Sequence, residues 1–520
     1  MRISVITFIL CWIFIGNIHA QSPPQQFHIN PYFHKPLKHG AHRIGTRQDA
    51  DMQRWCEYGL GQFIHWGVYS IPGGVWNEQK YTGAAEWIRV WNGISNEEYD
   101  NLYKQFNPTN FDAKKWARQA KEMGAKYLIF TTKHHDGFCM WKSATTDYHI
   151  GNTPYGKDIV KEIVDAYTAE GISVYLYFSI IDWSHPGYIS GGNINSPDVK
   201  QAFQSDAGIN PFISAEQEAK YEDFKEFTHA QLLELLENYP QIKGLWFDGS
   251  WDVAWVRNAA WVDALGHELR EKHPGLIIGS RFRSDELGNR HEDANGHLID
   301  DYDQRYERNL PASFEETKGF DWDCVMTIPE NQWGYHRDWS WTYVKTPYEL
   351  IEMTVRANSM NGNFVINFGP DGMGNIREEE TEIAREIGKW MAKNGEAIYG
   401  TRRSILEDQN WGHSTQKDDY IYLTIFNKPL NNMVRVKLPR STDRDKVFMI
   451  TESSILSTSE PVILNGGGRP GTFYRDKFGN SYFDLVVPES QRNSTMPFVM
   501  KIKVKEIDRG DMELYQQALI

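Results

Sequence analysis

Cysteine is scarce in this 520-residue chain, which contains only four. Cys11 lies in an apolar N-terminal stretch, so Cys56, Cys139 and Cys324 remain for at most one disulfide. The spacing of these three residues does not match that of a zinc site. The sequence therefore predicts neither a disulfide-rich scaffold nor a structural metal site.

Basic residues are fewer than acidic ones: the chain has 55 Lys and Arg against 69 Asp and Glu, and its net charge is −14. Such a chain is not expected to bind nucleic acid or an anionic membrane surface. Tryptophan, in contrast, is abundant, with 19 residues. Sugar-binding sites stack aromatic rings on pyranose rings, so this abundance favours a carbohydrate ligand, although most Trp side chains belong to protein cores.

Long apolar runs are lacking after the N-terminus, and none of the later ones is expected to span a membrane. Residues 1–20 combine one charge, Arg2, with a short apolar stretch and a small residue, Ala20, which is typical of a secretory signal. A membrane anchor is the alternative that the short apolar stretch disfavours. We expect a signal peptide over 1–20, a Pro-rich N-terminal arm over 21–50, and a mature protein that is exported, either periplasmic or secreted.

Strand-like and helix-like segments alternate over residues 51–396, which predicts a parallel sheet with crossover helices. No Gly-rich phosphate loop follows the first strand, and polar residues recur at strand ends, so an α/β fold of the TIM-like (β/α) barrel type is favoured over a doubly wound sheet. An eighth strand is not placed, because 282–322 is expected to be irregular. The expected strands are 62–67, 126–132, 172–179, 243–248, 276–281, 324–328 and 363–368. The expected helices are 96–106, 112–123, 158–170, 215–238, 253–271, 347–360 and 377–394.

The pattern changes after residue 396 to short alternating runs broken by turns. These runs predict a C-terminal β-sandwich over 397–508, followed by a tail over 509–520. The expected strands there are 420–426, 433–438, 446–450, 481–487 and 498–504. No motif in this region suggests catalysis, so the chemistry is assigned to the barrel domain, 51–396.

One carboxylate ends a predicted buried strand: Asp248 follows Leu-Trp-Phe and precedes Gly249. Barrel enzymes keep their chemistry at the carboxyl ends of their strands. We therefore hypothesise that Asp248 is a catalytic nucleophile. The alternative is an Asp that caps a helix or orders the loop.

Other polar side chains at predicted strand ends are expected to converge on the same pocket. They are His65, His134, His135, Tyr177 and Arg281. Imidazole and guanidinium groups are suitable donors to sugar hydroxyls, and a Tyr can hold a neighbouring carboxylate by a hydrogen bond. A glycosidase also needs two carboxylates across the sugar, about 5–5.5 Å apart if the configuration is retained.

The most distinctive short motif is His134-His135-Asp136-Gly137. Neighbouring strand residues point to opposite faces, so both imidazoles can enter one pocket only where the strand breaks, and Gly137 suits such a break. A zinc site and ordinary hydrogen-bonded core histidines are the alternatives. Neither HxH nor HExxH spacing is present to support the metal.

Further motifs occur in order along the barrel domain. The first are Gly61-Gln62-Phe63-Ile64-His65-Trp66-Gly67, Glu86-Trp87, Phe106-Asn107-Pro108, Gly124-Ala125-Lys126-Tyr127 and Thr132-Lys133-His134-His135-Asp136-Gly137-Phe138. The later ones are Trp246-Phe247-Asp248-Gly249, Trp333-Gly334-Tyr335, Gly362-Asn363-Phe364-Val365-Ile366-Asn367-Phe368-Gly369-Pro370 and Asn394-Gly395-Glu396-Ala397-Ile398-Tyr399-Gly400. Together these motifs resemble the α-L-fucosidases of glycoside hydrolase family 29, over roughly Trp55 to Thr401.

The resemblance implies a retaining exo-hydrolase that releases terminal α-L-fucosyl residues from glycans by double displacement, without a metal or other cofactor. It implies that Asp248 attacks the anomeric carbon. The implied sugar-binding residues are His65, Glu86, Trp87, His134, His135, Tyr177, Arg281 and Trp333. The alternatives are a related α-L-glycosidase, such as an exo-α-L-galactosidase acting on polysaccharides, and a catalytically inactive glycan-binding relative.

The acid/base glutamate is the point at which this chain departs from the family. Many members carry it in a Thr-Pro-Glu motif, which is missing here. Glu307 is the best match, because a polar pair and a proline follow it as in several relatives. The other acids of the segment, which could serve instead, are Asp303, Glu315 and Glu316. A surface Glu307 paired with Arg305 or Arg308 is the remaining alternative.

Overall fold

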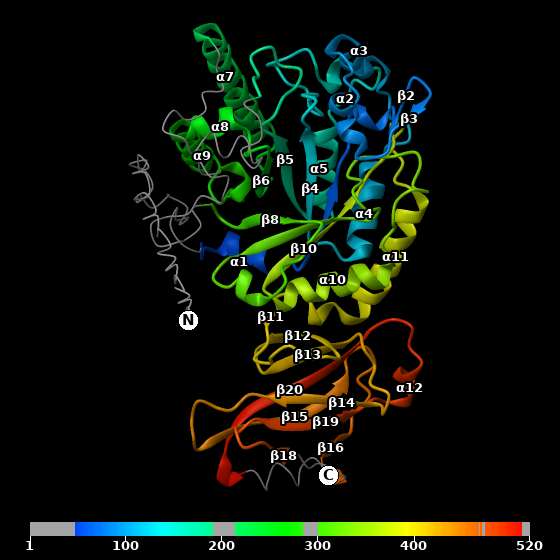
Figure 1. Cartoon of the computed structure of the whole chain (residues 1–520), viewed down its shortest axis with the longest axis vertical. Helices are drawn as coiled ribbons and strands as arrows, with labels where there is room; N and C mark the ends of the chain where they lie inside the picture. Colours follow the sequence, from blue (N-terminus) through cyan, green and yellow to red (C-terminus); the bar gives the residue numbers. More distant parts are fainter. Residues whose placement is uncertain (1–46, 191–213, 284–299, 467–468, 471–473, 512–520) are drawn as a thin grey trace, which may run out of the picture.

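The computed structural model describes residues 47–190, 214–283, 300–466, 469–470 and 474–511. The predicted signal peptide and most of the predicted arm and tail lie outside these residues. A sheet of parallel strands dominates the larger part of the chain, in the order β7-β6-β5-β4-β1-β10-β9-β8 (Figure 1). Its strands are β1 (Leu60–Ile64), β4 (Tyr127–Lys133), β5 (Ser173–Ser179), β6 (Gly244–Asp248), β7 (Ile277–Ile278), β8 (Asp303–Glu307), β9 (Trp322–Thr327) and β10 (Gly362–Phe368).

The two edge strands of this sheet lie beside each other. The backbone N–H of Asp301 donates to the carbonyl of Ile278 at 2.9 Å, and that of Ser280 donates to the carbonyl of Tyr302 at 2.9 Å. These bonds join the end of β7 to the residues before β8, so the sheet curves round on itself. The predicted TIM-like (β/α) barrel is confirmed.

Helices cover the outside of the barrel, and the strands alternate between its two faces. Leu245 and Phe247 of β6 pack outward in the main apolar core, whereas Tyr177 of β5 and Trp246 of β6 belong to an inner, largely aromatic cluster. The longer helices are α4 (Ala113–Met123), α5 (Ile159–Ala169), α7 (Ala215–Asn238), α9 (Ala259–Lys272), α10 (Pro347–Ser359) and α11 (Glu378–Asn394). The shorter ones are α1 (Ala50–Cys56), α2 (Ile88–Trp91), α3 (Asn96–Asp100) and α8 (Val253–Arg257).

The expectation that 282–322 is irregular was wrong at 303–307, where β8 lies, while 284–299 fall outside the described residues. Its sequence is Asp-Gln-Arg-Tyr-Glu, which has no apolar run to reveal a strand. Polar contacts to the segment after β7 hold it instead: the backbone N–H of Gln304 donates to Ser280 Oγ at 2.9 Å, and that of Arg281 donates to Gln304 Oε1 at 3.0 Å. The missing eighth strand is therefore a polar one that ends at Glu307.

Three further elements differ from expectation. The helix expected over 253–271 is two helices, α8 and α9, because the Asn258 side chain bonds the carbonyl of Ala254 where they meet. The strand expected over 276–281 is only β7, and Arg281 lies in the following 3-10 turn (Ser280–Phe282). The helix expected over 96–106 is α3 followed by a 3-10 helix (Asn101–Gln105).

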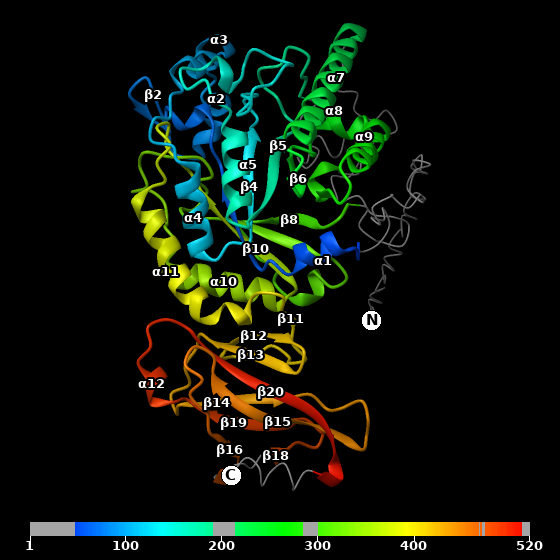
Figure 2. The ribbon, with the colours of Figure 1, turned by 180° about the vertical axis from the view of Figure 1, so that it is seen from behind.

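Two antiparallel sheets form the C-terminal part and share one apolar core, which confirms the predicted β-sandwich. One sheet contains β11 (Arg402–Arg403), β12 (Gly412–Lys417), β13 (Tyr420–Ile425), β20 (Phe498–Asp508) and β15 (Lys446–Ile455). The other contains β14 (Met433–Leu438), β19 (Ser481–Val486), β16 (Leu464–Gly466), β17 (Arg469–Pro470) and β18 (Tyr474–Arg475). Helix α10 lies between the barrel strands and these sheets (Figures 1 and 2).

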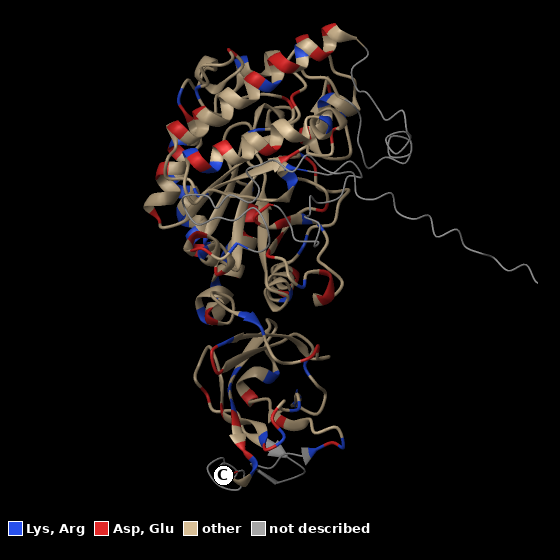
Figure 3. Cartoon of the chain, turned by 90° about the vertical axis from the view of Figure 1, so that its left-hand side faces the viewer, with Lys and Arg blue, Asp and Glu red and all other residues tan. Residues whose placement is uncertain are grey.

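The described residues carry interspersed charges of both signs (Figure 3) and no disulfide. Acidic and basic positions are interspersed along the helices in the side view of Figure 3. Cys56, Cys139 and Cys324 are unpaired thiols. Among the residues described, packing, hydrogen bonds and ion pairs hold the barrel.

Candidate active site

The predicted site residues converge on one cavity at the carboxyl ends of the barrel strands. The cavity has about 420 Å³ of empty space when its open mouth is included. The predicted residues that line it are His65, Glu86, Trp87, His134, His135, Asp248, Arg281, Glu307 and Trp333. Tyr177 does not line the cavity, but it contacts Asp248 from within the barrel.

Asp248 is the last residue of β6 and faces the cavity with only 9% of its surface exposed. The Tyr177 hydroxyl donates to its Oδ2 at 2.9 Å, and Arg281 Nη1 donates to its Oδ1 at 3.0 Å. Burial raises the pKa of Asp248 to about 6, and these two contacts offset only part of that rise. Asp248 is not a helix cap, because Asp252 accepts from the backbone at the start of α8.

Arg281 connects Asp248 to Glu307, the last residue of β8. Its Nη2 donates to Glu307 Oε2 at 2.5 Å while its Nη1 holds Asp248. Burial raises the pKa of Glu307, but the neighbouring charges, Arg281 first and Arg308 after it, together more than offset burial and leave that pKa below its usual value. One guanidinium therefore holds two carboxylates side by side at the cavity.

Glu307 is the only one of the four candidate acids of its segment that lines the cavity. Asp303 is buried at the start of β8 and paired with Arg305. Glu315 and Glu316 lie on the surface in a 3-10 turn (Phe314–Glu316). Arg308 lies 3.7 Å from Glu307, so the surface ion pair considered from the sequence is only a secondary contact.

The paired histidines both reach the cavity because β4 breaks where they occur. The register of β4 against β5 shifts between Thr131 and Lys133, and the strand ends at Lys133. Gly137 then turns the chain with φ of +80°, a conformation that side chains rarely adopt. The ring centroids of His134 and His135 are 4.3 Å apart.

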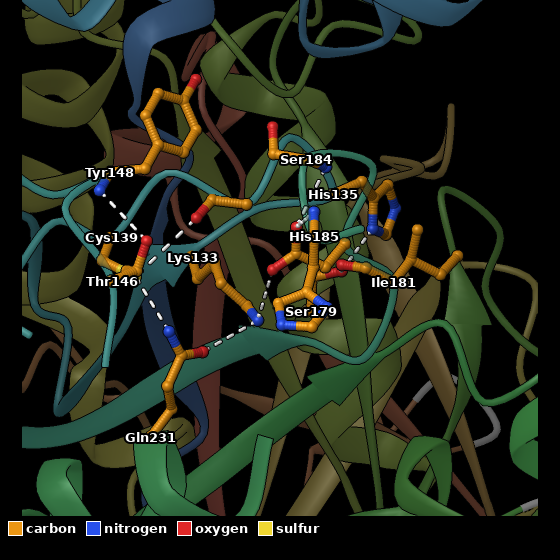
Figure 4. A network of polar contacts seen from close by, with 12 residues as sticks. Lys133, His135, Cys139, Thr146, Tyr148, Ser179, Ile181, Ser184, His185 and Gln231 are labelled. Carbon is orange, nitrogen blue, oxygen red and sulfur yellow. Dashed lines mark hydrogen bonds and ion pairs between the residues drawn. The ribbon is translucent and has the colours of Figure 1, made fainter. Parts of the chain in front are cut away.

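A buried ionic network holds this turn in place, seen in Figure 4 around Lys133 and Gln231. Lys133 Nζ donates to Asp182 Oδ2 at 3.1 Å and to Gln231 Oε1 at 3.0 Å. Asp182 Oδ1 in turn accepts from the backbone of Ser184 and His185. The network fixes the loop after β5 against the loop after β4, so the side chains that both loops carry keep their positions.

Glu86 is fully buried beside the cavity, and its Oε2 accepts from the backbone of Gly334 at 2.9 Å. Its Oε1 has no hydrogen-bond partner among the described residues. Burial raises the pKa of Glu86 to about 7, so part of the population carries a proton near neutral pH. Glu86 can therefore donate or accept a hydrogen bond at the cavity wall.

Aromatic side chains form much of the remaining wall. Trp87 lies edge-on to His135 with ring centroids 5.0 Å apart, and Trp333 lies 5.0 Å from His65. Sequence reasoning missed four lining residues: Phe63, Trp246, Trp251 and Val325.

Strand alternation could have found two of the four, because Phe63 and Trp246 lie two positions before His65 and Asp248 on the same faces. Val325 is different, since only the register of β8 against β9 places it opposite Glu307. Trp251 lies three residues after Asp248 in the loop that follows β6, with its ring centroid 6.3 Å from that of His135. No strand or helix periodicity in the sequence could have predicted that a residue of this loop lines the cavity.

A family model for α-L-fucosidase matches residues 41–396. The chain belongs to the α-L-fucosidase family. It is therefore a glycoside hydrolase, and a fucosylated glycan is the class of substrate that the family implies.

Solved α-L-fucosidase structures resemble most of the chain. A bacterial fucosidase with a monovalent iminocyclitol inhibitor shares 43% identity, with a TM-score of 0.79 over 91% of this chain and 100% of that one. A GH29 α-L-fucosidase from Bacteroides thetaiotaomicron, trapped as a covalent intermediate with 2-fluoro-fucosyl fluoride in a Glu-to-Gln mutant, shares 42% identity, with a TM-score of 0.78 over 90% and 99%. The tissue α-L-fucosidase of Rattus norvegicus is 27% identical over 79% of this chain and 84% of its own.

All the residues that line the cavity fall inside the region that the family model matches, 41–396. Within the described ranges, no three His, Cys, Asp or Glu side chains are arranged to hold a metal ion. Of the helices that the structure describes, none is long and apolar enough to cross a membrane.

Proposed function

We propose that this family member is a retaining exo-α-L-fucosidase, with Asp248 as nucleophile and Glu307 as acid/base. The observation that carries the proposal is that Arg281 holds these two carboxylates on adjacent nitrogens at the mouth of one cavity. Retaining glycosidases use two carboxyl groups only about 5–5.5 Å apart. The covalent intermediate trapped in the Bacteroides relative supports the same chemistry.

In the first step, an Asp248 oxygen attacks the anomeric carbon while Glu307 gives its proton to the departing glycosidic oxygen. The bond from carbon to the leaving oxygen breaks as the bond to Asp248 forms. In the second step, Glu307 takes a proton from water, whose oxygen displaces Asp248 and releases fucose. Tyr177 and Arg281 hold Asp248 in line for attack.

The cavity wall supports fucose over galactose as the terminal sugar. Fucose carries a methyl group where galactose carries a hydroxymethyl group, and Phe63, Trp246 and Val325 give the cavity apolar surface. An apolar wall rejects an added hydroxyl by only about 100-fold. We therefore expect slow but measurable hydrolysis of α-L-galactosides. Export of the protein is likewise proposed, on residues 1–20 alone.

Hydrolysis of 4-nitrophenyl α-L-fucoside tests the proposal. Asp248→Asn is expected to lower kcat by at least about 1,000-fold, because it removes the nucleophile. Asp112→Asn is the control, since Asp112 caps α4 and Asn caps a helix equally well. Full turnover by the Asp248 variant would remove this residue from the mechanism.

Trapping identifies the nucleophile directly. Glu307→Gln incubated with 2-fluoro-fucosyl fluoride is expected to gain the mass of one fluorofucosyl group on the peptide that contains Asp248. A label on any other peptide contradicts the assignment. Absence of hydrolysis by the native chain on both fucoside and galactoside would favour a glycan-binding relative instead.

A further inference from the structure

The proton on His65 has a fixed position. His65 Nδ1 lies 2.7 Å from Asn367 Oδ1, and Asn367 Nδ2 donates to the carbonyl of Trp333 at 2.7 Å. A carbonyl only accepts, so the orientation of the Asn367 amide is settled and its Oδ1 must accept from His65. Nδ1 therefore carries the proton, and Nε2 keeps a lone pair.

The proton on His135 is fixed by a separate contact. His135 Nδ1 lies 2.6 Å from Ser179 Oγ, and Ser179 Oγ donates its only proton to the carbonyl of Ile181 at 2.6 Å (Figure 4). His135 must therefore donate from Nδ1, which leaves a lone pair on Nε2. This nitrogen lies 3.6 Å from Asp248 Oδ2, beside the reacting carboxylate.

Both imidazoles are uncharged at neutral pH. Burial lowers the pKa of His65 to about 4 and that of His135 to about 3. Arg281 faces both rings and lowers each pKa further, as do Lys133 and His65 for His135, while Glu307 and Asn367 oppose the shift for His65. The two rings thus offer acceptors, not the donors that the sequence alone suggested.

The cavity also lacks an available cation. Among the described residues that line it, Arg281 is the only Lys or Arg. Both of its terminal nitrogens are bound to carboxylates, Asp248 and Glu307. A sulfate or phosphate group on the sugar would therefore find no unpaired cation in the lining and would meet acidic side chains.

We propose that Asn367 and Ser179 are positioning residues that hold His65 and His135 as hydrogen-bond acceptors, so that the cavity takes a terminal fucose whose ring hydroxyls are free. Each Nε2 accepts from one sugar hydroxyl. A fucose whose ring hydroxyls are sulfated or methylated cannot supply these donors. This inference rests on the proposed fucosidase activity and names the class of sugar that the site accepts.

Nitrogen-15 NMR of the full chain labelled in histidine tests the proton positions directly. His65→Gln and His135→Gln variants assign the two rings by loss of signals. Both rings are expected to be neutral with the proton on Nδ1 near pH 7. A proton on Nε2 of either ring would overturn the proposal for that residue.

Substituted fucosides test the consequence for substrate choice. The 4-nitrophenyl α-L-fucosides carrying one sulfate or one methyl group on a ring hydroxyl are compared with the parent. Substitution at each of at least two of the three ring hydroxyls is expected to lower kcat/KM by about 100-fold or more, because a buried acceptor is left without its donor. If the parent itself is not cleaved, the proposed function fails; if the parent and the sulfated fucosides are cleaved at similar rates, only this inference fails.

Asn367→Asp tests the positioning role, with Asn363→Asp as a matched control. Asn363 lies on the same strand, β10, is equally buried and makes the same kind of bonds, to the backbone of Gly59 and Trp55. A carboxylate at position 367 favours the protonated form of His65, which cannot accept a hydrogen bond at Nε2. Near neutral pH, kcat/KM of Asn367→Asp is therefore expected to be at least about tenfold below that of the control. The ratio of the two values is expected to recover as pH rises and His65 loses its extra proton. A ratio that is independent of pH would show that Asn367 is only structural.

Discussion

At the scale of single residues, the site depends on how Arg281 divides its charge between two acids. Burial raises the pKa of Asp248 to about 6, whereas at Glu307 the cations Arg281 and Arg308 contribute to a net lowering of the pKa. The proposed chemistry needs Asp248 ionised and Glu307 protonated. In the reactive form, the carboxyl groups of Asp248 and Glu307 therefore hold one proton between them. Because the two groups interact, the two observed pKa values belong to the pair and not to either residue alone.

This proton count predicts an acidic pH optimum for kcat/KM, which reports the free enzyme. Below the lowered pKa of Glu307 the pair holds two protons, and Asp248 cannot attack. Above about pH 6 the pair loses its last proton, and no acid remains for the leaving group. We expect kcat/KM on 4-nitrophenyl α-L-fucoside to rise from low pH, peak between the two pKa values and fall as pH passes about 6.

A stopped assay across the pH range checks this expectation, since 4-nitrophenolate is read after quenching in base. The Asp112→Asn control is expected to keep the same profile. A level profile from about pH 5 to about pH 8 would contradict the assignment of the two carboxyls.

At the scale of elements, the turn after β4 decides whether two adjacent histidines share one cavity. A Cβ on Gly137 would lie 2.2 Å from Asp182 Oδ1. Asp182 cannot move away freely, because it holds Lys133 and the backbone of the loop after β5. Gly137 is thus required both for its backbone conformation and for this close approach.

Gly137→Ala is expected to destabilise the protein and to lower kcat/KM by about 100-fold, because a displaced Asp182 shifts His135 within the site. Gly171→Ala is the control: it has φ of +77° but nothing within 4 Å of its Cβ. The control is expected to lose about 1–2 kcal/mol of unfolding free energy and to keep its activity. Denaturant unfolding and fucoside kinetics measure the two effects, and equal activity of both variants would refute the positioning role of this turn.

At the scale of the whole molecule, the β-sandwich supports the barrel without reaching the cavity. The described residues that line the cavity end at Trp333, well before the first strand of the sandwich. Contact between the parts runs through α10 and α11: Tyr348 packs on Phe426 and donates to its carbonyl, and Trp390 donates to the carbonyl of Pro497 at 2.7 Å. The sandwich therefore contributes stability rather than chemistry.

Phe426→Ala separates these two contributions. Phe426 is only 7% exposed, so its truncation is expected to lower the unfolding free energy by about 3–5 kcal/mol while kcat/KM of the folded protein stays unchanged. Phe478→Ala, at a side chain that is 66% exposed in the same domain, is expected to leave the thermal midpoint nearly unchanged. A fall in kcat/KM at temperatures where Phe426→Ala is fully folded would show that the sandwich influences the site.

The sequence by itself determined the barrel, the sandwich and most of the strand-end residues. Apolar runs that end in a polar residue, such as the one leading into Asp248, are local patterns, and parallel strands bring their carboxyl ends together wherever they lie in the chain. Helix boundaries were equally local: Asp112 caps α4 and Gly124 ends it with φ of 98°.

Only the tertiary structure decided which acid joins Asp248, because β8 is polar and is held by contacts that no periodic pattern encodes. It is the register of β8 against β9 that brings Glu307 to the cavity. The proton positions on His65 and His135 also required coordinates, since Asn367 and Ser179 lie 302 and 44 residues away from them in the chain. Strand patterns are set by neighbours in sequence, whereas hydrogen-bond direction is set by neighbours in space.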